Sequence, residues 1–251
     1  MPNVLVEKKD RATIVTLNRP ERRNALTIEL LTELTAAMDS AADSDQRILI
    51  LRGSGKVFCA GLDLQETAET EKAHRSAEMV ARTLLAVSQT RLITIAQVHG
   101  AAVAGGAGLM SACDFVVAAE GTKIGYPETK RGLVAGLVMT FLRRQLRERD
   151  IRELLFTGDL ISAERAREIG LVNRVVPPNE LENETQKIVE AVLQNAPAAL
   201  ANTKRLIEEL WSSSVKEDVE SALRHHMEAR ESAEAKEGIA AFLEKRSPNW
   251  Q

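Results

Sequence analysis

Two stretches of small residues follow apolar, strand-like segments and could expose backbone N–H groups. The first is Cys59-Ala60-Gly61, and the second, residues 99–108, reads HGAAVAGGAG. A peptide N–H reaches an incoming oxygen only where no side chain blocks the approach. The first stretch would expose the N–H of Ala60 or Gly61, and Gly105-Gly106 would expose another at a helix start. Two such donors on one oxygen form an oxyanion hole, although tight turns with close packing would show the same residues.

A carboxylate that could move protons lies in the segment IGYPETKRGL, residues 124–133. Glu128 follows a proline, in a loop that begins with an apolar residue and is flanked by two glycines. A carboxyl group in such surroundings can have a raised pKa and act as a general acid or base. A solvated or helix-capping glutamate is the alternative.

The other reactive side chains have simpler explanations. His99 precedes a glycine at a strand end and is expected to be structural. His225-His226 lie on a charged helix without a third ligand nearby, so no metal site is expected. Cys59 has no base beside it in the sequence and is interpreted as a small core residue. Ser111 stands where a third glycine would complete a dinucleotide motif, so no nucleotide cofactor is expected.

The elements that must position these residues alternate between strands and helices in the first half of the chain. Short apolar runs predict strands, and segments with helical spacing of apolar residues predict helices. The predicted strands are 12–17, 47–53, 92–100 and 114–121, and the predicted helices are 28–41 (capped by Thr27), 74–89 and 101–112. This alternation is typical of βαβ units with parallel strands.

After about residue 140 the chain becomes helical and heavily charged. Predicted helices cover 141–156, 162–170, 180–196 and 198–211, and residues 171–176 predict a short strand. Ser162 is expected to cap a helix start and Gly170 a helix end. We therefore predict an α/β fold with a core over residues 1–190 and a helical region over residues 191–251.

Composition excludes several classes of protein. The 251 residues carry a net charge of −3, without a basic block, so a nucleic-acid partner is not expected. Two cysteines far apart indicate a reducing compartment rather than a disulfide framework. The absence of a signal-like start or a long apolar run predicts a cytoplasmic protein without a membrane partner.

Five ordered segments resemble the enoyl-CoA hydratase/isomerase family, also called the crotonase family. They are NRPERRNAL (18–26), VFCAGLDL (57–64), residues 98–133, residues 154–176 and GIAAFLEKRSPNW (238–250). The resemblance spans essentially the whole chain. It implies a spiral of ββα turns, a helical C-terminal region that forms trimers, and a homotrimer or dimer of trimers. It also implies an acyl-CoA substrate in fatty acid metabolism, with coenzyme A as part of the substrate and no separate cofactor.

The resemblance also assigns roles to individual residues. The backbone N–H groups of Ala60 and Gly105 would form the oxyanion hole for a thioester carbonyl, with Glu128 as the acid/base. Asp63 and Leu64 would lie near the adenine, and Phe242 and Lys245 would reach the coenzyme A of a neighbouring subunit. The substrate-binding residues expected on this basis are Arg23, Ala25, Leu26, Gly61, Asp63, Leu64, Gly106, Gly108, Phe242 and Lys245.

One position departs from the family pattern. Family hydratases carry two glutamates around one water; Glu128 matches one of them, but Gly108 stands at the position of the other. Losing one positioned acid/base group typically costs roughly 10²–10⁴ in rate. Neighbouring Lys130 and Arg131 are interpreted as surface charges; the alternative is an inward-facing cation that meets a carboxylate of the substrate.

Three functions remain open after this departure. In the first, Glu128 alone hydrates a 2-enoyl-CoA, including branched ones such as methylglutaconyl-CoA that would use the space beside Gly108. In the second, Glu128 shuttles a proton as in Δ3,Δ2-enoyl-CoA isomerases. In the third, the protein binds acyl-CoA without turnover. Local similarity around residues 105–114 and 128–136 favours the hydratase, a lyase.

Overall fold

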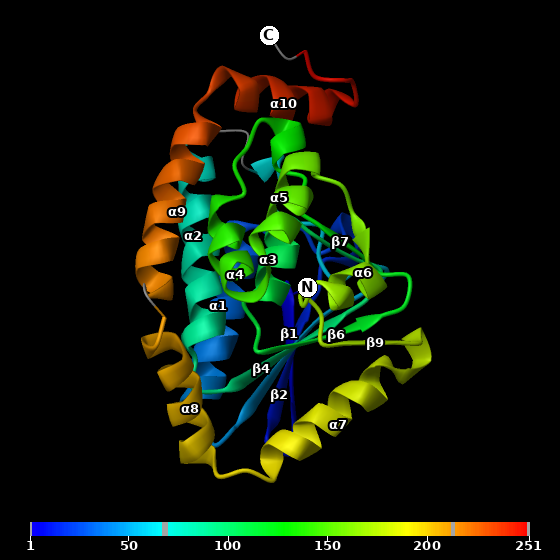
Figure 1. Ribbon diagram of the computed structural model, residues 1–251, viewed down its shortest axis with the longest axis vertical. Coiled ribbons are helices and arrows are strands. Elements are labelled where there is room, and N and C mark those ends of the chain that lie inside the picture. Colours follow the sequence, from blue (N-terminus) through cyan, green and yellow to red (C-terminus); the bar gives the residue numbers. More distant parts are fainter. Residues whose placement is uncertain (1, 67–69, 212–213, 250–251) are drawn as a thin grey trace.

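A six-stranded sheet forms the centre of the computed structural model, which describes residues 2–66, 70–211 and 214–249 (Figure 1). Its strands, in spatial order, are β1 (Val4–Lys9), β2 (Ala12–Leu17), β3 (Ile48–Gly53), β4 (Ile93–Val98), β6 (Phe115–Ala119) and β9 (Arg174–Val176). β1 pairs with β2 in antiparallel fashion, and every other neighbouring pair is parallel. The predicted parallel α/β core is therefore confirmed.

A smaller sheet carries the loops that the sequence singled out. It contains β5 (Ala101–Val103), β7 (Lys123–Gly125) and β8 (Ile161–Ser162), with β7 in the middle. Single parallel bridges extend the pairing, joining Cys59 to Ala102 and Leu26 to Leu62. Segments around residues 26, 60 and 102 thus lie side by side, although they are far apart in sequence.

Helices cover the sheets and close the top of the molecule in Figure 1. The α-helices are α1 (Ile28–Ala42), α2 (Thr70–Gln89), α3 (Gly105–Ser111), α4 (Gly136–Gln145), α5 (Glu148–Thr157), α6 (Ala163–Glu168), α7 (Leu181–Leu193), α8 (Pro197–Glu209), α9 (Val215–Arg230) and α10 (Ala233–Glu244). Short 3-10 helices are η1 (Pro20–Arg22), η3 (Thr129–Arg131) and η4 (Pro178–Glu180). Among the described residues, no helix is long and apolar enough to cross a bilayer.

The main sheet is buried on both faces, which explains its continuous apolar runs. Along β3, Leu49 and Leu51 join the large core cluster that includes α1 and α2, whereas Ile48 and Ile50 face the other way. That second face packs against α7 through side chains such as Ile188. Because successive side chains of a strand point to opposite faces of the sheet, β3 contributes side chains to both core clusters.

Three features differ from the sequence-based prediction. Residues 101–103 form β5 rather than the start of a helix, because they pair with β7 and bridge to Cys59. The helix predicted over 141–156 is two helices, α4 and α5, because Leu146 adopts an extended conformation. β1, which the sequence analysis did not identify, is an edge strand whose side chains are mostly exposed.

The predicted helix caps are confirmed. The side chain of Thr27 accepts a hydrogen bond from the Leu30 N–H at the start of α1. Ser162 accepts likewise from the Arg165 N–H at the start of α6, and Gly170 after its end has a φ of 93°. These are the capping geometries that end helices cleanly.

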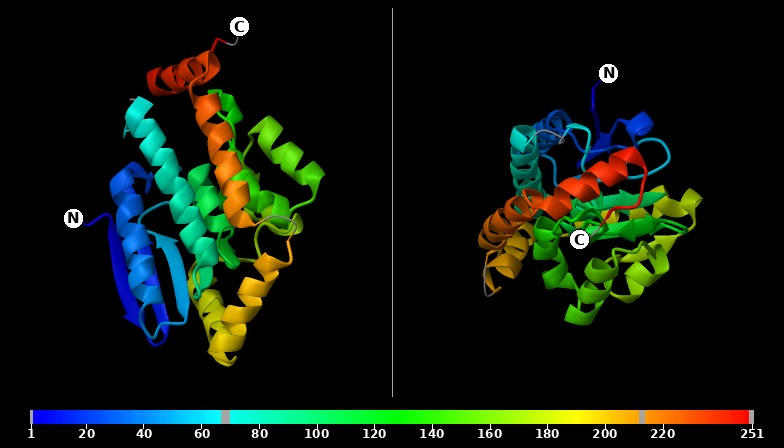
Figure 2. Two further views of the ribbon diagram at one scale, coloured as in Figure 1. Left: turned by 90° about the vertical axis from the view of Figure 1, so that its left-hand side faces the viewer. Right: turned by 90° about the horizontal axis from the view of Figure 1, so that it is seen from above.

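The C-terminal helices pack onto the core, as both views in Figure 2 show. α9 lies against α2 and α4, and α10 lies against η3. The α10 contact is made backbone to backbone: a Cβ on Gly238 would lie 2.4 Å from the Arg131 carbonyl carbon. The division at residue 190 and a trimer-forming role for residues 191–251 stay predictions.

Buried Asn24 is expected to be a main support of this fold. Its Nδ2 donates to the carbonyls of Ser54, Val57 and Phe58 at 2.9, 2.9 and 3.1 Å. Asn24→Ala leaves these acceptors without their donor and should lower the free energy of unfolding by roughly 2–3 kcal/mol in urea denaturation. Asn183→Ala, at an exposed site on α7, is the control and should change it by less than about 0.5 kcal/mol. Equal losses of unfolding free energy in the two variants would contradict a supporting role for Asn24.

Candidate active site

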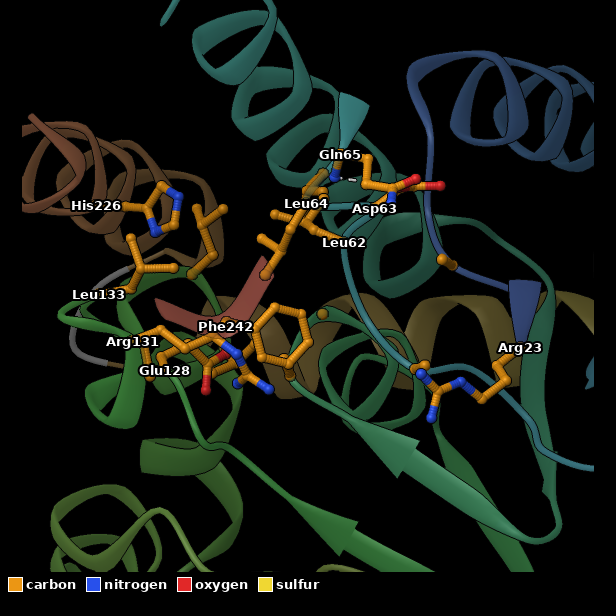
Figure 3. Close-up of a pocket in the computed structure, with 18 of the residues that line it drawn as sticks. Arg23, Leu62, Asp63, Leu64, Gln65, Glu128, Arg131, Leu133, His226 and Phe242 are labelled. Carbon is orange, nitrogen blue, oxygen red and sulfur yellow. Dashed lines mark hydrogen bonds between the residues drawn. The ribbon is translucent and has the colours of Figure 1, made fainter. Parts of the chain in front are cut away.

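A cavity of about 530 Å³ opens between the small sheet and the helices above it (Figure 3). One wall comes from the loops before α1 and after residue 59, and another from η3 and the start of α4. α9 contributes His226, and α10 contributes Phe242. Glu128 and Gly105, both expected to be catalytic, line this one cavity.

The structure corrects which backbone N–H near residue 60 is available. The Ala60 N–H already donates to the Arg23 carbonyl at 3.0 Å, and the Gly61 N–H faces the Cys59 sulfur. The next N–H, that of Leu62, donates to no carbonyl among the described residues, and Leu62 lines the cavity. Sequence reasoning missed Leu62 because only strand pairing shows which way each N–H faces.

The N–H groups of Leu62 and Gly105 belong to backbone segments that lie close together. A Cβ on Gly61 would lie 2.9 Å from the Val103 carbonyl oxygen and 3.5 Å from the Gly105 nitrogen. Gly61 also has a φ of 92°, which only glycine adopts easily. The Gly105 N–H begins α3 and donates to no described residue. A Cβ on Gly105 would lie 4.0 Å from the Leu62 nitrogen, so the two donors lie near each other, as an oxyanion hole requires.

Strain in the backbone accompanies this arrangement. Ala104 precedes α3 with a φ of 50° and a ψ of −123°, an unusual conformation for a residue with a side chain. Its own N–H donates to the Gly125 carbonyl at 2.9 Å, which fixes the segment on the small sheet. The turn directs the chain from β5 into α3 within one residue and leaves the Gly105 N–H beside the cavity.

Glu128 is a buried carboxyl group at the wall of the cavity. It follows β7 through Pro127 and is 9% exposed. Its Oε2 atom is buried and has no hydrogen-bond partner among the described residues. Burial raises the pKa of Glu128 to about 7, against smaller lowering effects of its own backbone N–H and of Arg131. A carboxyl group with this pKa can both accept and return a proton near neutral pH.

The structure also corrects the interpretation of the cations after Glu128. Lys130 is exposed and paired with Asp159, as expected of a surface charge. Arg131 instead lines the cavity, with its guanidinium carbon 4.5 Å from the centre of the Phe242 ring. Burial lowers the pKa of Arg131, and Glu128 opposes that shift.

His226 is a cavity residue that sequence reasoning did not identify as functional. Its Nδ1 lies 3.2 Å from the Val134 carbonyl oxygen, and its buried Nε2 has no partner within the described chain. Burial lowers the pKa of His226, so the ring is neutral near neutral pH. Because a carbonyl only accepts, Nδ1 carries the proton and Nε2 presents a lone pair.

The expected substrate-binding residues divide into two groups. Those that line the cavity are Arg23, Ala25, Asp63, Leu64, Phe242 and Lys245. Those that do not are Leu26, Gly61, Gly106 and Gly108. Leu26 is fully buried in the core, and Gly106 permits close packing, because a Cβ there would lie 2.5 Å from the Cys59 carbonyl oxygen.

Two of the lining residues behave differently from the expectation. Phe242 and Lys245 line the cavity of their own chain rather than projecting away from it. α10 folds back over η3, which places both side chains there.

Asp63 is nearly buried and bonded to Arg19 and Arg22, each at 3.3 Å, so it holds the wall of the cavity.

No open space lies beside Gly108. A Cβ built on Gly108 would lie 2.7 Å from Cγ1 of Val138 and 3.7 Å from Cδ2 of Leu84. Apolar side chains therefore fill the place where a glutamate would project. The expectation of extra room for a branched acyl chain at this position is wrong.

Comparison with known proteins identifies the family. The family model for enoyl-CoA hydratase/isomerase matches residues 7–251. The chain belongs to this family. It is 40% identical to a Thermus thermophilus protein provisionally named an enoyl-CoA hydratase, over 97% of this chain and 98% of the relative. It is 32% identical to a crotonyl-CoA hydratase of Syntrophomonas wolfei, covering 99% and 97% of the two chains.

Solved structures confirm the crotonase fold. A carnitinyl-CoA hydratase from Mycobacterium avium superposes with a TM-score of 0.88 at 30% identity, covering 100% of this chain and 99% of that one. The names of these relatives differ in the acyl group, so family membership leaves the substrate of this enoyl-CoA hydratase/isomerase open. Within the described residues, no three His, Cys, Asp or Glu side chains gather as metal ligands.

The titration of Glu128 should be visible in the activity of this family member. The expected acid/base role of Glu128 predicts that kcat/KM rises with pH around a midpoint near 7, the pKa that burial gives Glu128, because only its carboxylate form accepts a proton. The measurement is initial rate at low substrate between about pH 5.5 and about pH 8.5. A profile that is flat over this range, or that falls with pH, would contradict the assignment.

Proposed function

We propose that this protein adds water to the double bond of a 2-enoyl-CoA thioester. The observation that carries the proposal is the buried Glu128 carboxyl, whose Oε2 has no hydrogen-bond partner among the described residues. It lines the same cavity as Leu62 and Gly105, whose N–H groups donate to no described carbonyl. The names of the relatives support hydration as the reaction class.

In the proposed mechanism, Leu62 and Gly105 donate to the thioester oxygen. Glu128 takes a proton from water while the water oxygen bonds to C3, and the electrons of the double bond move onto the thioester as an enolate. Glu128 then returns the proton to C2, and the carbonyl re-forms. Each backbone donor is worth roughly 3 kcal/mol, because it binds the oxygen more strongly as negative charge develops there.

The coenzyme A portion is proposed to lie towards Arg23 and Lys245. Both are exposed cations that line the cavity, and Arg23 lies across the cavity from Glu128 in Figure 3. Cations at this rim suit the phosphate groups of coenzyme A. The reacting end would then lie beside Glu128, among apolar side chains such as Leu133 and Leu137.

One observation favours isomerisation as the second candidate. Val138 and Leu84 occupy the place of the second glutamate, so a reaction that needs one proton shuttle fits this site directly. A purely binding role is less consistent with the structure. A buried carboxyl with a raised pKa destabilises the folded protein at neutral pH, a cost that binding alone does not require.

Assembly into a homotrimer or dimer of trimers is part of the proposal. α8 and the residues after it expose apolar side chains on one helical stretch: Leu206, Ile207, Leu210 and Trp211. Exposed apolar groups of this kind are typical of surfaces that are covered by another subunit.

Liquid chromatography of the products, followed by mass and by the ultraviolet absorbance of the conjugated thioester, distinguishes the candidates. Crotonyl-CoA and a 3-enoyl-CoA are incubated separately with the purified protein. Gain of one water on crotonyl-CoA supports hydration. A 3-enoyl-CoA converted to its 2-enoyl isomer without any gain of mass would replace that proposal with isomerisation.

Glu128→Gln should abolish turnover while binding of a saturated acyl-CoA survives, because only the proton carrier is lost. The variant should also be more stable. The pKa of Glu128 rises from 4.5 to about 7 on folding, so the carboxylate destabilises the fold above pH 4.5, most strongly above 7. Urea denaturation should show a gain of up to about 3 kcal/mol at about pH 8.5, fading towards pH 4.5. Turnover within tenfold of wild type would contradict the role of Glu128.

The filled space beside Gly108 predicts the outcome of restoring the second glutamate. Gly108→Glu alone should not raise crotonyl-CoA hydration, because the new side chain meets Val138. Gly108→Glu combined with Val138→Ala opens that space and should raise hydration by about tenfold or more. Val138→Ala alone is the control. If the folded double variant hydrates crotonyl-CoA no faster than this control, Val138 is not what prevents a glutamate at position 108 from acting.

A further inference from the structure

Arg131 has an unusual setting for a charged side chain. It is half-buried, lines the cavity and stacks on Phe242. Its Nη1 donates to the Pro127 carbonyl at 3.2 Å, whereas its buried Nε has no acceptor within the described residues. No carboxylate in the described part of the chain lies within 4.0 Å of the guanidinium, so it has no direct ion pair there.

The charge of Arg131 is only partly balanced by its surroundings. The Phe242 ring face attracts a cation, but this is a weak substitute for an anion. Glu128 is close enough to act on Arg131 electrostatically, yet with a pKa of about 7 it is partly protonated near neutral pH. A partly buried guanidinium in this state favours a bound anion.

The position of Arg131 separates it from Arg23. Arg131, Glu128 and Phe242 lie together in Figure 3, and Arg23 lies on the opposite side of the cavity. An anion at Arg131 would therefore be part of the reacting group rather than a coenzyme A phosphate. His226 is neutral and its Nδ1 proton is engaged by the Val134 carbonyl, so it does not form a second anion site.

The guanidinium is not the only group that holds α10 against η3. The contact between α10 and η3 is made by backbone atoms, since Gly238 approaches the Arg131 carbonyl and Gly132 approaches Glu234. A cation placed only to adjust the acidity of Glu128 would affect every substrate alike. Neither a packing role for Arg131 nor an effect on the acidity of Glu128 predicts discrimination between acyl chains.

We propose that Arg131 is a specificity-determining residue that binds a carboxylate on a short acyl chain. The preferred substrates would then be coenzyme A monothioesters of unsaturated dicarboxylic acids. The part of this inference that concerns turnover rests on the proposed hydration, whereas the part that concerns binding does not.

Binding of unreactive thioesters tests the inference without turnover. Glutaryl-CoA and pentanoyl-CoA have acyl chains of equal length and differ in a terminal carboxylate or methyl group. Calorimetry should show wild type binding glutaryl-CoA about tenfold more tightly, as expected for a charge-assisted pair. Arg131→Gln should remove this preference, Arg131→Lys should keep part of it, and Lys130→Gln, at the exposed neighbour, should leave it unchanged.

Three results would overturn the inference. Wild type could prefer pentanoyl-CoA, or Arg131→Gln could weaken both ligands equally, which would indicate a packing role. Alternatively, the preference could persist in Arg131→Gln.

Rates with glutaconyl-CoA and 2-pentenoyl-CoA then separate this inference from the proposed function. Arg131→Gln should lower kcat/KM about tenfold on glutaconyl-CoA and less than about threefold on 2-pentenoyl-CoA. An equal shift of both pH profiles with an unchanged ratio of rates would show instead that Arg131 only adjusts Glu128. If wild type turns over neither thioester while the binding preference holds, the hydratase proposal fails and carboxylate recognition stands.

Discussion

The close approach of two backbone segments, residues 61–62 and 103–105, is the constraint on which the site depends. Gly61 allows it, because a side chain there would meet the Val103 carbonyl and the φ of 92° would be strained. Buried Asn24 supports the same region by tying its own loop to the carbonyls of residues 54, 57 and 58. With these contacts made, the Leu62 and Gly105 N–H groups are left without partners in the described chain, beside one cavity.

A second constraint is the burial of a carboxyl group beside those donors. Removing Glu128 from water disfavours its charged form, which raises its pKa to about 7. The same desolvation reduces the stability of the fold above pH 4.5 and makes the group a proton carrier near neutral pH. Arg131 moderates this effect from the next turn of the chain.

The third constraint is the cover over the cavity, which is formed by helices α9 and α10. α9 brings His226 to the cavity from the side of α2 and α4, and α10 brings Phe242 and Lys245 over η3. Gly132 and Gly238 let the two backbones touch, so the cover sits directly on the loop that carries Glu128 and Arg131. The C-terminal helix therefore packs directly beside the end of the cavity that contains Glu128.

Local sequence patterns determined much of this protein. Apolar runs and helical spacing predicted the parallel strands and most helices, and a proline-glutamate pair between glycines made Glu128 a candidate acid/base. The ordered motifs also identified the family that the comparisons confirm. These features are readable because strand burial, helix periodicity and loop composition depend on neighbours in the chain.

Only the tertiary structure decided the points that depend on contacts between distant segments. Pairing with the loop at residue 23 engages the Ala60 N–H and leaves that of Leu62 available. Val138, thirty residues from Gly108, fills the space beside it. The fold of α10 brings Phe242 over Arg131, which turns an apparent surface charge into a cavity residue. Side-chain direction and long-range packing, which no local pattern encodes, set each of these outcomes.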